Sequence, residues 1–179
     1  QVLLHTRVCR PQGEARGRVA VVNHGSPPDA ASRPAMRPTA CDNEAVEWFL
    51  RRGFVVVLGQ RRGYGLTGGR YAEAIGGCSA REYVAAGQES ARDIDALIRY
   101  ATALPYARPD QVVVVGQSAG GWASVALNSR PPAPVVAVVS MAGGRGGHAN
   151  STPNMNCRPD ELVKAAGQLG TKAALPMLW

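Results

Sequence analysis

The sequence contains few aromatic and few charged residues, and it lacks long apolar runs. Aromatic side chains make up 6% and charged side chains 18% of the 179 residues. The hydrophobic fraction of 45% is sufficient for a buried core, so the composition excludes a disordered chain. No apolar run approaches the ~20 residues that cross a bilayer, which predicts no membrane span. We therefore expect residues 1–179 to belong to a single globular domain.

Lysine is nearly absent, and the basic residues are scattered. Lys164 and Lys172 are the only lysines among 20 basic residues, and 13 acidic residues leave a net charge of +7. The longest basic runs are Arg51-Arg52 and Arg61-Arg62. Proteins that bind nucleic acids concentrate basic charge on one face and interleave it with aromatic residues. We therefore attribute the arginine excess to composition and expect no nucleic-acid partner.

The four cysteines form no C-x-x-C pair. They are Cys9, Cys41, Cys78 and Cys157. Without C-x-x-C a zinc site or a thioredoxin-type motif is not expected, and an even count allows two disulfides with three connectivities or four free thiols. Cys78 and Cys157 each follow a predicted strand, so a disulfide between them would join two loops beside the site; two unrelated thiols are the alternative. The even count and the initial Gln1 favour a secreted or periplasmic protein over a cytoplasmic one.

Short valine-rich runs alternate with helix-like segments. The runs lie at residues 18–23, 54–58, 111–115, 135–139 and 175–179. Continuous apolar strands are typical of a parallel sheet that is buried on both faces. Helices are predicted over residues 43–52, with Asp42 as the cap, 85–103 and 119–129. Residues 2–9 predict an antiparallel edge strand. The alternation predicts an α/β fold with right-handed crossovers.

The third run leads into a G-x-S-x-G sequence and then a helix. The segment is Gly116-Gln117-Ser118-Ala119-Gly120. Small residues on both sides of Ser118 let the chain turn sharply enough to raise its Oγ above the sheet, and the helix N-terminus supplies amide donors. Active sites of such sheets lie at the carboxyl ends of the strands. We therefore predict that Ser118 is a nucleophile; the alternative is a glycine turn whose serine only caps the helix.

Two other strand ends extend the pattern. The first run ends in Asn23-His24-Gly25-Ser26, and Gln60-Arg61-Arg62-Gly63-Tyr64-Gly65 follows the second. With these segments, the chain from about Val2 to Trp179 resembles the α/β-hydrolase superfamily, near the dienelactone-hydrolase and prolyl-oligopeptidase branches. The resemblance implies the α/β-hydrolase fold, a mostly parallel central sheet flanked by helices, and a serine, histidine and acid without a cofactor. It also implies an oxyanion hole made by the amides of Ser26 and Ala119.

Several side chains are expected to line or support the pocket. These are His24, which we expect to brace the oxyanion loop, Tyr64 and Tyr71 after the second run, and His148 after the fourth. For Tyr64 and Tyr71, packing at the surface is an equal alternative. His148 is the only histidine after Ser118 and is expected either near the site or, less economically, as the base. Residues 63–68 match G-x-G-x-x-G, but no helix pattern follows them, so we expect no dinucleotide.

The acid and base of the superfamily are not found after Ser118. The family order is serine, acid, histidine, and the only later acids are Asp160 and Glu161, at a predicted helix start. We therefore expect the acid and histidine beyond Trp179, a chain that is incomplete at its C-terminus, and poor solubility and no activity for isolated residues 1–179.

The sequence predicts a serine hydrolase that cleaves carboxylic ester or amide bonds of a small molecule through an acyl-enzyme on Ser118, with esters favoured. The alternative is a non-catalytic α/β-hydrolase-like binding protein that lacks a working triad. The sequence gives no prediction of oligomeric state.

Overall fold

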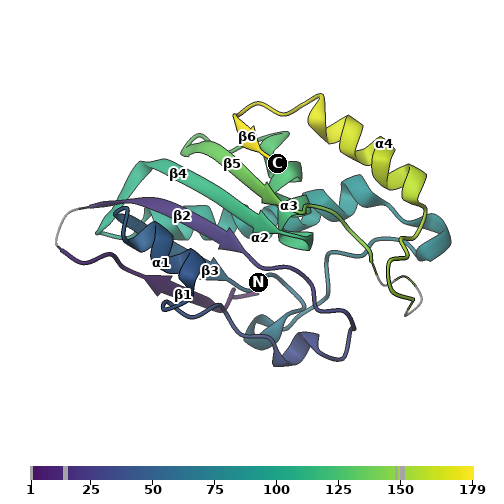
Figure 1. The fold of residues 1–179 in the computed structure, drawn as a ribbon, viewed down its shortest axis with the longest axis horizontal. Helices are drawn as coiled ribbons and strands as arrows, with labels where there is room; N and C mark the ends of the chain where they lie inside the picture. The colour runs from purple at the N-terminus through teal and green to yellow at the C-terminus, as the bar shows by residue number, and fades with distance from the viewer. Residues whose placement is uncertain (1, 14–15, 148, 150–151) are drawn as a thin grey trace.

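A computed structural model describes residues 2–13, 16–147, 149 and 152–179 (Figure 1). Within these residues six strands form one sheet in the order β1-β3-β2-β4-β5-β6. The strands are β1 (Thr6–Cys9), β2 (Gly17–Asn23), β3 (Phe54–Gly59), β4 (Ala107–Gln117), β5 (Val135–Met141) and β6 (Met177–Leu178). β1 is antiparallel to β3, and all other neighbouring strands are parallel. The predicted mostly parallel α/β-hydrolase fold is therefore confirmed.

Helices cover both faces of the sheet (Figure 1). They are α1 (Glu44–Leu50), α2 (Tyr83–Thr102), α3 (Ala119–Asn128) and α4 (Pro159–Gly170), with 3-10 turns η1 (Arg33–Ala35), η2 (Gly65–Thr67) and η3 (Cys78–Ala80). α1 packs on one face through Val46, which is buried with Val56 and Leu58. α2, α3 and α4 cover the other face, where Ile94 and Trp122 pack against Val19 and Val57. The central strands β3, β2 and β4 are largely buried on both sides, which explains their continuous valine runs.

Several predicted boundaries shift by a few residues. The first helix begins at Glu44, because the side chain of Asn43, and not Asp42, accepts the amide of Ala45 at 3.1 Å. β4 is longer than predicted and begins at Ala107. The last run forms only the short strand β6, and the G-x-G-x-x-G segment forms the single turn η2 and no α-helix.

All four cysteines are paired. One disulfide joins Cys9 to Cys41, and the other joins Cys78 to Cys157. We call the second one the rim disulfide, because it ties the loop after β3 to the loop after β5, beside the cavity described below. None of the described helices combines the length and the apolar character that crossing a bilayer requires.

Candidate active site

Ser118 lies on a strained turn between β4 and α3. Its backbone has a φ of 52° and a ψ of −117°, a conformation that is rare for a residue with a side chain. The end of β5 supports this turn, since the Ser118 amide donates to Met141 O at 2.9 Å and Gly144 N donates to Ser118 O at 3.2 Å. Strain of this kind persists only where the surrounding structure enforces it, as at the nucleophile of a strand-turn-helix elbow.

Glycines allow the chain to pack closely around the elbow. A Cβ on Gly120 would lie 2.6 Å from His24 O, and a Cβ on Gly116 would collide with Gly120 O. A Cβ on Gly25 would lie 3.3 Å from the Cβ of Ser118. The loop after β2 therefore runs directly beside the elbow, and no larger residue fits at these contacts without a shift of the backbone.

Two backbone amides beside the cavity have no acceptor among the described residues. The first intrahelical bond of α3 runs from Trp122 N to Ser118 O, so the amide of Ala119 has no acceptor inside the helix. Within the described residues, the amide of Ser26 has no hydrogen-bond acceptor either. Two donors on either side of a nucleophile match the requirements of an oxyanion hole.

A cavity of about 650 Å³ opens over the elbow. Ser118, Ala119 and Ser26 all line it, together with Tyr71 from the loop after β3 and Cys157 of the rim disulfide. Its volume falls within the range of small-molecule sites. The structure thus brings five residues singled out in the sequence to one concave surface, and Ser118, Ala119 and Ser26 lie on it at the carboxyl ends of β2 and β4.

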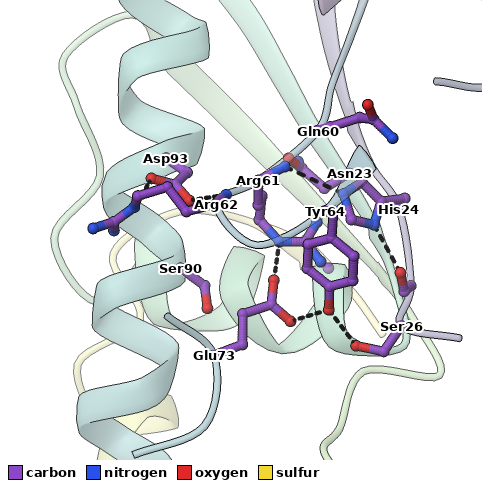
Figure 2. A network of polar contacts seen from close by, with 12 residues as sticks. Asn23, His24, Ser26, Gln60, Arg61, Arg62, Tyr64, Glu73, Ser90 and Asp93 are labelled. Carbon is purple, nitrogen blue, oxygen red and sulfur yellow. Dashed lines mark hydrogen bonds and ion pairs between the residues drawn. The ribbon is translucent and has the colours of Figure 1, made fainter. Parts of the chain in front are cut away.

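A buried carboxylate, Glu73, supports the wall of this cavity. Its side chain is 2% exposed and accepts from Arg145 at 2.8 Å. It also accepts from the Tyr64 hydroxyl at 2.7 Å and from Arg61 Nε (Figure 2). Burial alone would raise the pKa of Glu73, but the charges of Arg61 and Arg145 outweigh burial and lower it to about 2. Arg145 also donates to the Tyr71 hydroxyl at 2.7 Å.

Tyr64 and His24 support the oxyanion loop from behind the cavity lining. The Tyr64 hydroxyl lies 2.5 Å from Ser26 Oγ, between Ser26 and Glu73 (Figure 2). His24 Nε2 accepts from the amide of Arg61 at 3.3 Å, so its Nδ1 carries the proton and donates to Gly25 O at 2.7 Å. Burial, with help from Arg61, lowers the pKa of His24 to about 4, so the ring is neutral at pH 7. Both ring nitrogens are engaged in holding the loop.

The two acids that follow Ser118 in the sequence lie apart from this constellation. His148 lies outside the described residues. Asp160 and Glu161 lie in the first turn of α4, and Glu161 pairs with Lys164 at 3.0 Å. Neither acid lines the cavity. Within the part of the chain that the structure describes, no three His, Cys, Asp or Glu side chains gather in a way that could hold a metal ion.

Sequence analysis did not find Glu73 or Arg145. Both lie in loops without periodicity, and the contact between them spans 72 positions. Glu73 lies in the loop that follows β3, and Arg145 lies in the loop that follows β5. Their position after a strand was the only local sign that they belong to the site, because active sites of such sheets lie at the carboxyl ends of the strands.

Comparisons with known proteins agree with this architecture. A family model described as X-Pro dipeptidyl-peptidase (S15 family) matches residues 1–174. No curated protein matches the chain. Among solved structures, acetyl xylan esterase 1 from Thermoanaerobacterium sp. JW/SL YS485 is 22% identical, with a TM-score of 0.51 over 76% of this chain and 43% of the esterase. The acetyl xylan esterase from Paenibacillus sp. R4 is 17% identical, with a TM-score of 0.56 over 78% of this chain and 44% of that one.

A third solved structure, Est1E from Butyrivibrio proteoclasticus with bound ferulic acid, covers 98% of this chain and 73% of its own at 12% identity and a TM-score of 0.61. At such identities these structures show a common fold, and the chain spans less than half the length of the two acetyl xylan esterases. The family match covers nearly the whole chain. The chain therefore belongs to the X-Pro dipeptidyl-peptidase (S15) family, within the α/β-hydrolase superfamily of serine hydrolases.

Proposed function

We propose that this protein hydrolyses carboxylic esters of small molecules through an acyl-enzyme on Ser118. The observation that carries the proposal is the strained Ser118, which lines one cavity together with Ser26 and Ala119. Strain at a serine is costly and has no evident structural purpose here, whereas a nucleophile gains exposure and nearby donors from it.

In the proposed reaction, Ser118 Oγ attacks the carbonyl carbon and a histidine takes its proton. The amides of Ser26 and Ala119 stabilise the negative charge on the carbonyl oxygen. Collapse of the tetrahedral intermediate breaks the bond to the leaving alcohol, which takes up the proton from the histidine. Water then attacks the acyl-enzyme and releases the acid, and Ser118 regains its proton.

We assign the histidine and its acid to residues beyond Trp179, as the family order of serine, acid and histidine implies. His24 is engaged through both nitrogens and has a pKa of about 4, which disfavours it as the base. Without a base, the serine would keep an ordinary hydroxyl and lose most of its reactivity.

We favour esters over amides because the similar folds include acetyl xylan esterases, although the family is named for a peptidase. We also propose secretion or export to the periplasm. Two disulfides support this assignment, because disulfides persist in oxidising compartments.

Labelling with a fluorophosphonate probe tests the nucleophile. The full-length protein is expected to react at Ser118, S118A is expected not to react, and S129A serves as a matched control because Ser129 caps the far end of α3. Hydrolysis of 4-nitrophenyl acetate is then compared with hydrolysis of glycyl-prolyl-4-nitroanilide. Absence of labelling would overturn the enzyme assignment in favour of a binding protein, and faster cleavage of the anilide would overturn the esterase preference.

A further inference from the structure

Three arginines and no acid line the cavity above Ser118. They are Arg33, Arg81 and Arg145, and none of the described lining residues is Asp or Glu. Each comes from a different segment: Arg33 from η1 after β2, Arg81 from the loop before α2, and Arg145 from the loop after β5. Three strand ends therefore deliver positive charge to one site, although the arginines form no cluster in the sequence.

Arg145 is only partly neutralised by its surroundings. Its side chain is 14% exposed and shares the carboxylate of Glu73 with Arg61, so two guanidinium groups face one carboxylate. On its other side Arg145 donates to the Tyr71 hydroxyl; burial would raise the pKa of that hydroxyl, but the charge and the hydrogen bond of Arg145 act against burial and the pKa is lowered. Arg61, Arg145 and Glu73 together carry one positive charge in excess beside the cavity.

Within the described residues neither Arg33 nor Arg81 forms a salt bridge. Arg33 acts on the exposed Asp29, whose pKa is lowered mainly by its hydrogen bond with Ser32 and only slightly by the charge of Arg33. Arg33 stacks on Tyr71, with its guanidinium carbon 3.6 Å from the ring centroid, and its buried Nε has no hydrogen-bond partner within the described part of the chain. A guanidinium held flat on an aromatic ring presents its edge in a fixed direction, and that edge is suited to bind a carboxylate with two hydrogen bonds.

A concave site with excess positive charge attracts anions and disfavours cations. Since all three arginines share the cavity with the nucleophile, the charge acts on the substrate and not on a distant surface. The arrangement therefore bears on which esters reach Ser118.

We propose that the substrate is an ester that carries a carboxylate, which Arg33 and Arg81 bind while Arg145 adds positive potential below them. This inference rests on the proposed function, because it names the substrate class of the same site. Uncharged esters of similar size are expected to be hydrolysed more slowly.

Two pairs of esters test the charge and locate it on the substrate. The first pair compares mono-4-nitrophenyl glutarate with 4-nitrophenyl pentanoate and tests a carboxylate on the acyl side of the ester. The second pair compares 4-acetoxybenzoate with its methyl ester and tests a carboxylate on the leaving group. In the full-length protein, the anionic member of at least one pair is expected to have a kcat/KM about tenfold higher or more, the effect of a charged hydrogen bond. The preference is expected to shrink as salt rises, because Arg33 and Arg81 are partly exposed.

Variants identify the residues responsible. R33Q and R81Q are each expected to lower the anionic preference, measured as the ratio of kcat/KM for the two members of a pair, by about tenfold. R108Q makes the same change of charge at the opposite end of β4, where Arg108 lies 3.9 Å from Asp110, and is expected to change neither rate. Equal loss of the preference in R108Q, or retention of it in the double variant R33Q/R81Q, would overturn the assignment.

A binding measurement separates this inference from the proposed function. Calorimetry on S118A, which cannot form an acyl-enzyme, compares 4-hydroxybenzoate with 4-hydroxybenzamide. Tighter binding of the anion, lost in S118A/R33Q/R81Q, supports the inference even if the wild-type protein hydrolyses neither ester. Equal binding of the two compounds, together with equal turnover within both ester pairs, would overturn it while leaving the nucleophile in place.

Discussion

Replacing Glu73 with glutamine keeps the size and shape of the side chain but removes its charge. The carboxylate is buried and accepts from Arg61, Arg145 and Tyr64. In E73Q the completely buried Arg61 and the largely buried Arg145 would face each other without a counter-ion. We expect the variant to fold less stably and to lose its activity together with the order of the cavity wall.

Two lines of reasoning give the same magnitude. Removing one partner of a buried ion pair costs about 3–5 kcal/mol. Independently, a pKa lowered from 4.5 to about 2 corresponds to roughly 3 kcal/mol of interaction between the charged form and the folded protein. We therefore expect the free energy of unfolding of E73Q to be about 3 kcal/mol lower than that of the wild type at pH 7.

The interaction of Glu73 with the two arginines also makes the free energy of unfolding depend on pH. The pKa of Glu73 is lower in the folded protein than in the unfolded chain, so its contribution is complete above about pH 4.5 and is lost as the pH falls towards 2. The gap between wild type and E73Q should therefore narrow below about pH 4.5. His24, whose pKa is lowered to about 4, destabilises both proteins as the pH falls below 6.5 and largely cancels in the comparison.

Urea unfolding of the full-length proteins at several pH values between 7 and 3.5 measures this gap. E47Q serves as the control, because Glu47 forms an exposed ion pair with Arg51 at 2.9 Å, and its loss should cost no more than about 0.5 kcal/mol. A gap for E73Q below about 1 kcal/mol at pH 7, or one that stays constant down to pH 3.5, would refute the reasoning.

Three further variants probe the geometry of the site. G120A places a Cβ against the carbonyl oxygens of Asn23 and His24, and kcat is expected to fall about 100-fold because the elbow is displaced. A kcat within twofold of the wild type would show that the close packing at Gly120 is not needed for the reaction. Y64F removes the hydroxyl between Ser26 and Glu73, and we expect kcat/KM to fall about tenfold, measured with 4-nitrophenyl acetate; unchanged kinetics would show that the loop holds without it. The double variant C78S/C157S removes the rim disulfide and is expected to lower the free energy of unfolding by about 4 kcal/mol, because the bond closes a long loop. Calorimetric or urea unfolding that matches the wild type would contradict this expectation.

The elements that the sequence predicted best are those with a strong local pattern. The valine runs of β2, β3 and β4 lie largely buried in the middle of the sheet, so their continuous apolar character carried the information directly. The elbow was equally local, because the sharp turn at Ser118 needs glycines at fixed offsets. The first helix boundary was missed because Asn43 and Asp42 are both good caps, and only the backbone conformation decides between them.

The polar wall of the cavity could not be predicted in the same way. Glu73, Arg145 and Arg33 meet only after the strands have brought their loops together, and no spacing in the sequence marks contacts across tens of residues. The scattered arginines suggested a compositional excess, whereas the fold gathers Arg61 and Arg145 on one buried carboxylate. Long-range charge pairing of this kind leaves no local signal.

The rim disulfide also makes residues 78–157 a closed covalent ring that contains α2, β4, α3 and β5, and with them the elbow. A protease that cuts inside the ring opens the chain without releasing a fragment. Such a nicked molecule would migrate as one species until it is reduced. In an environment rich in proteases, the two parts of the site would thus stay joined after a break in the polypeptide that carries its nucleophile.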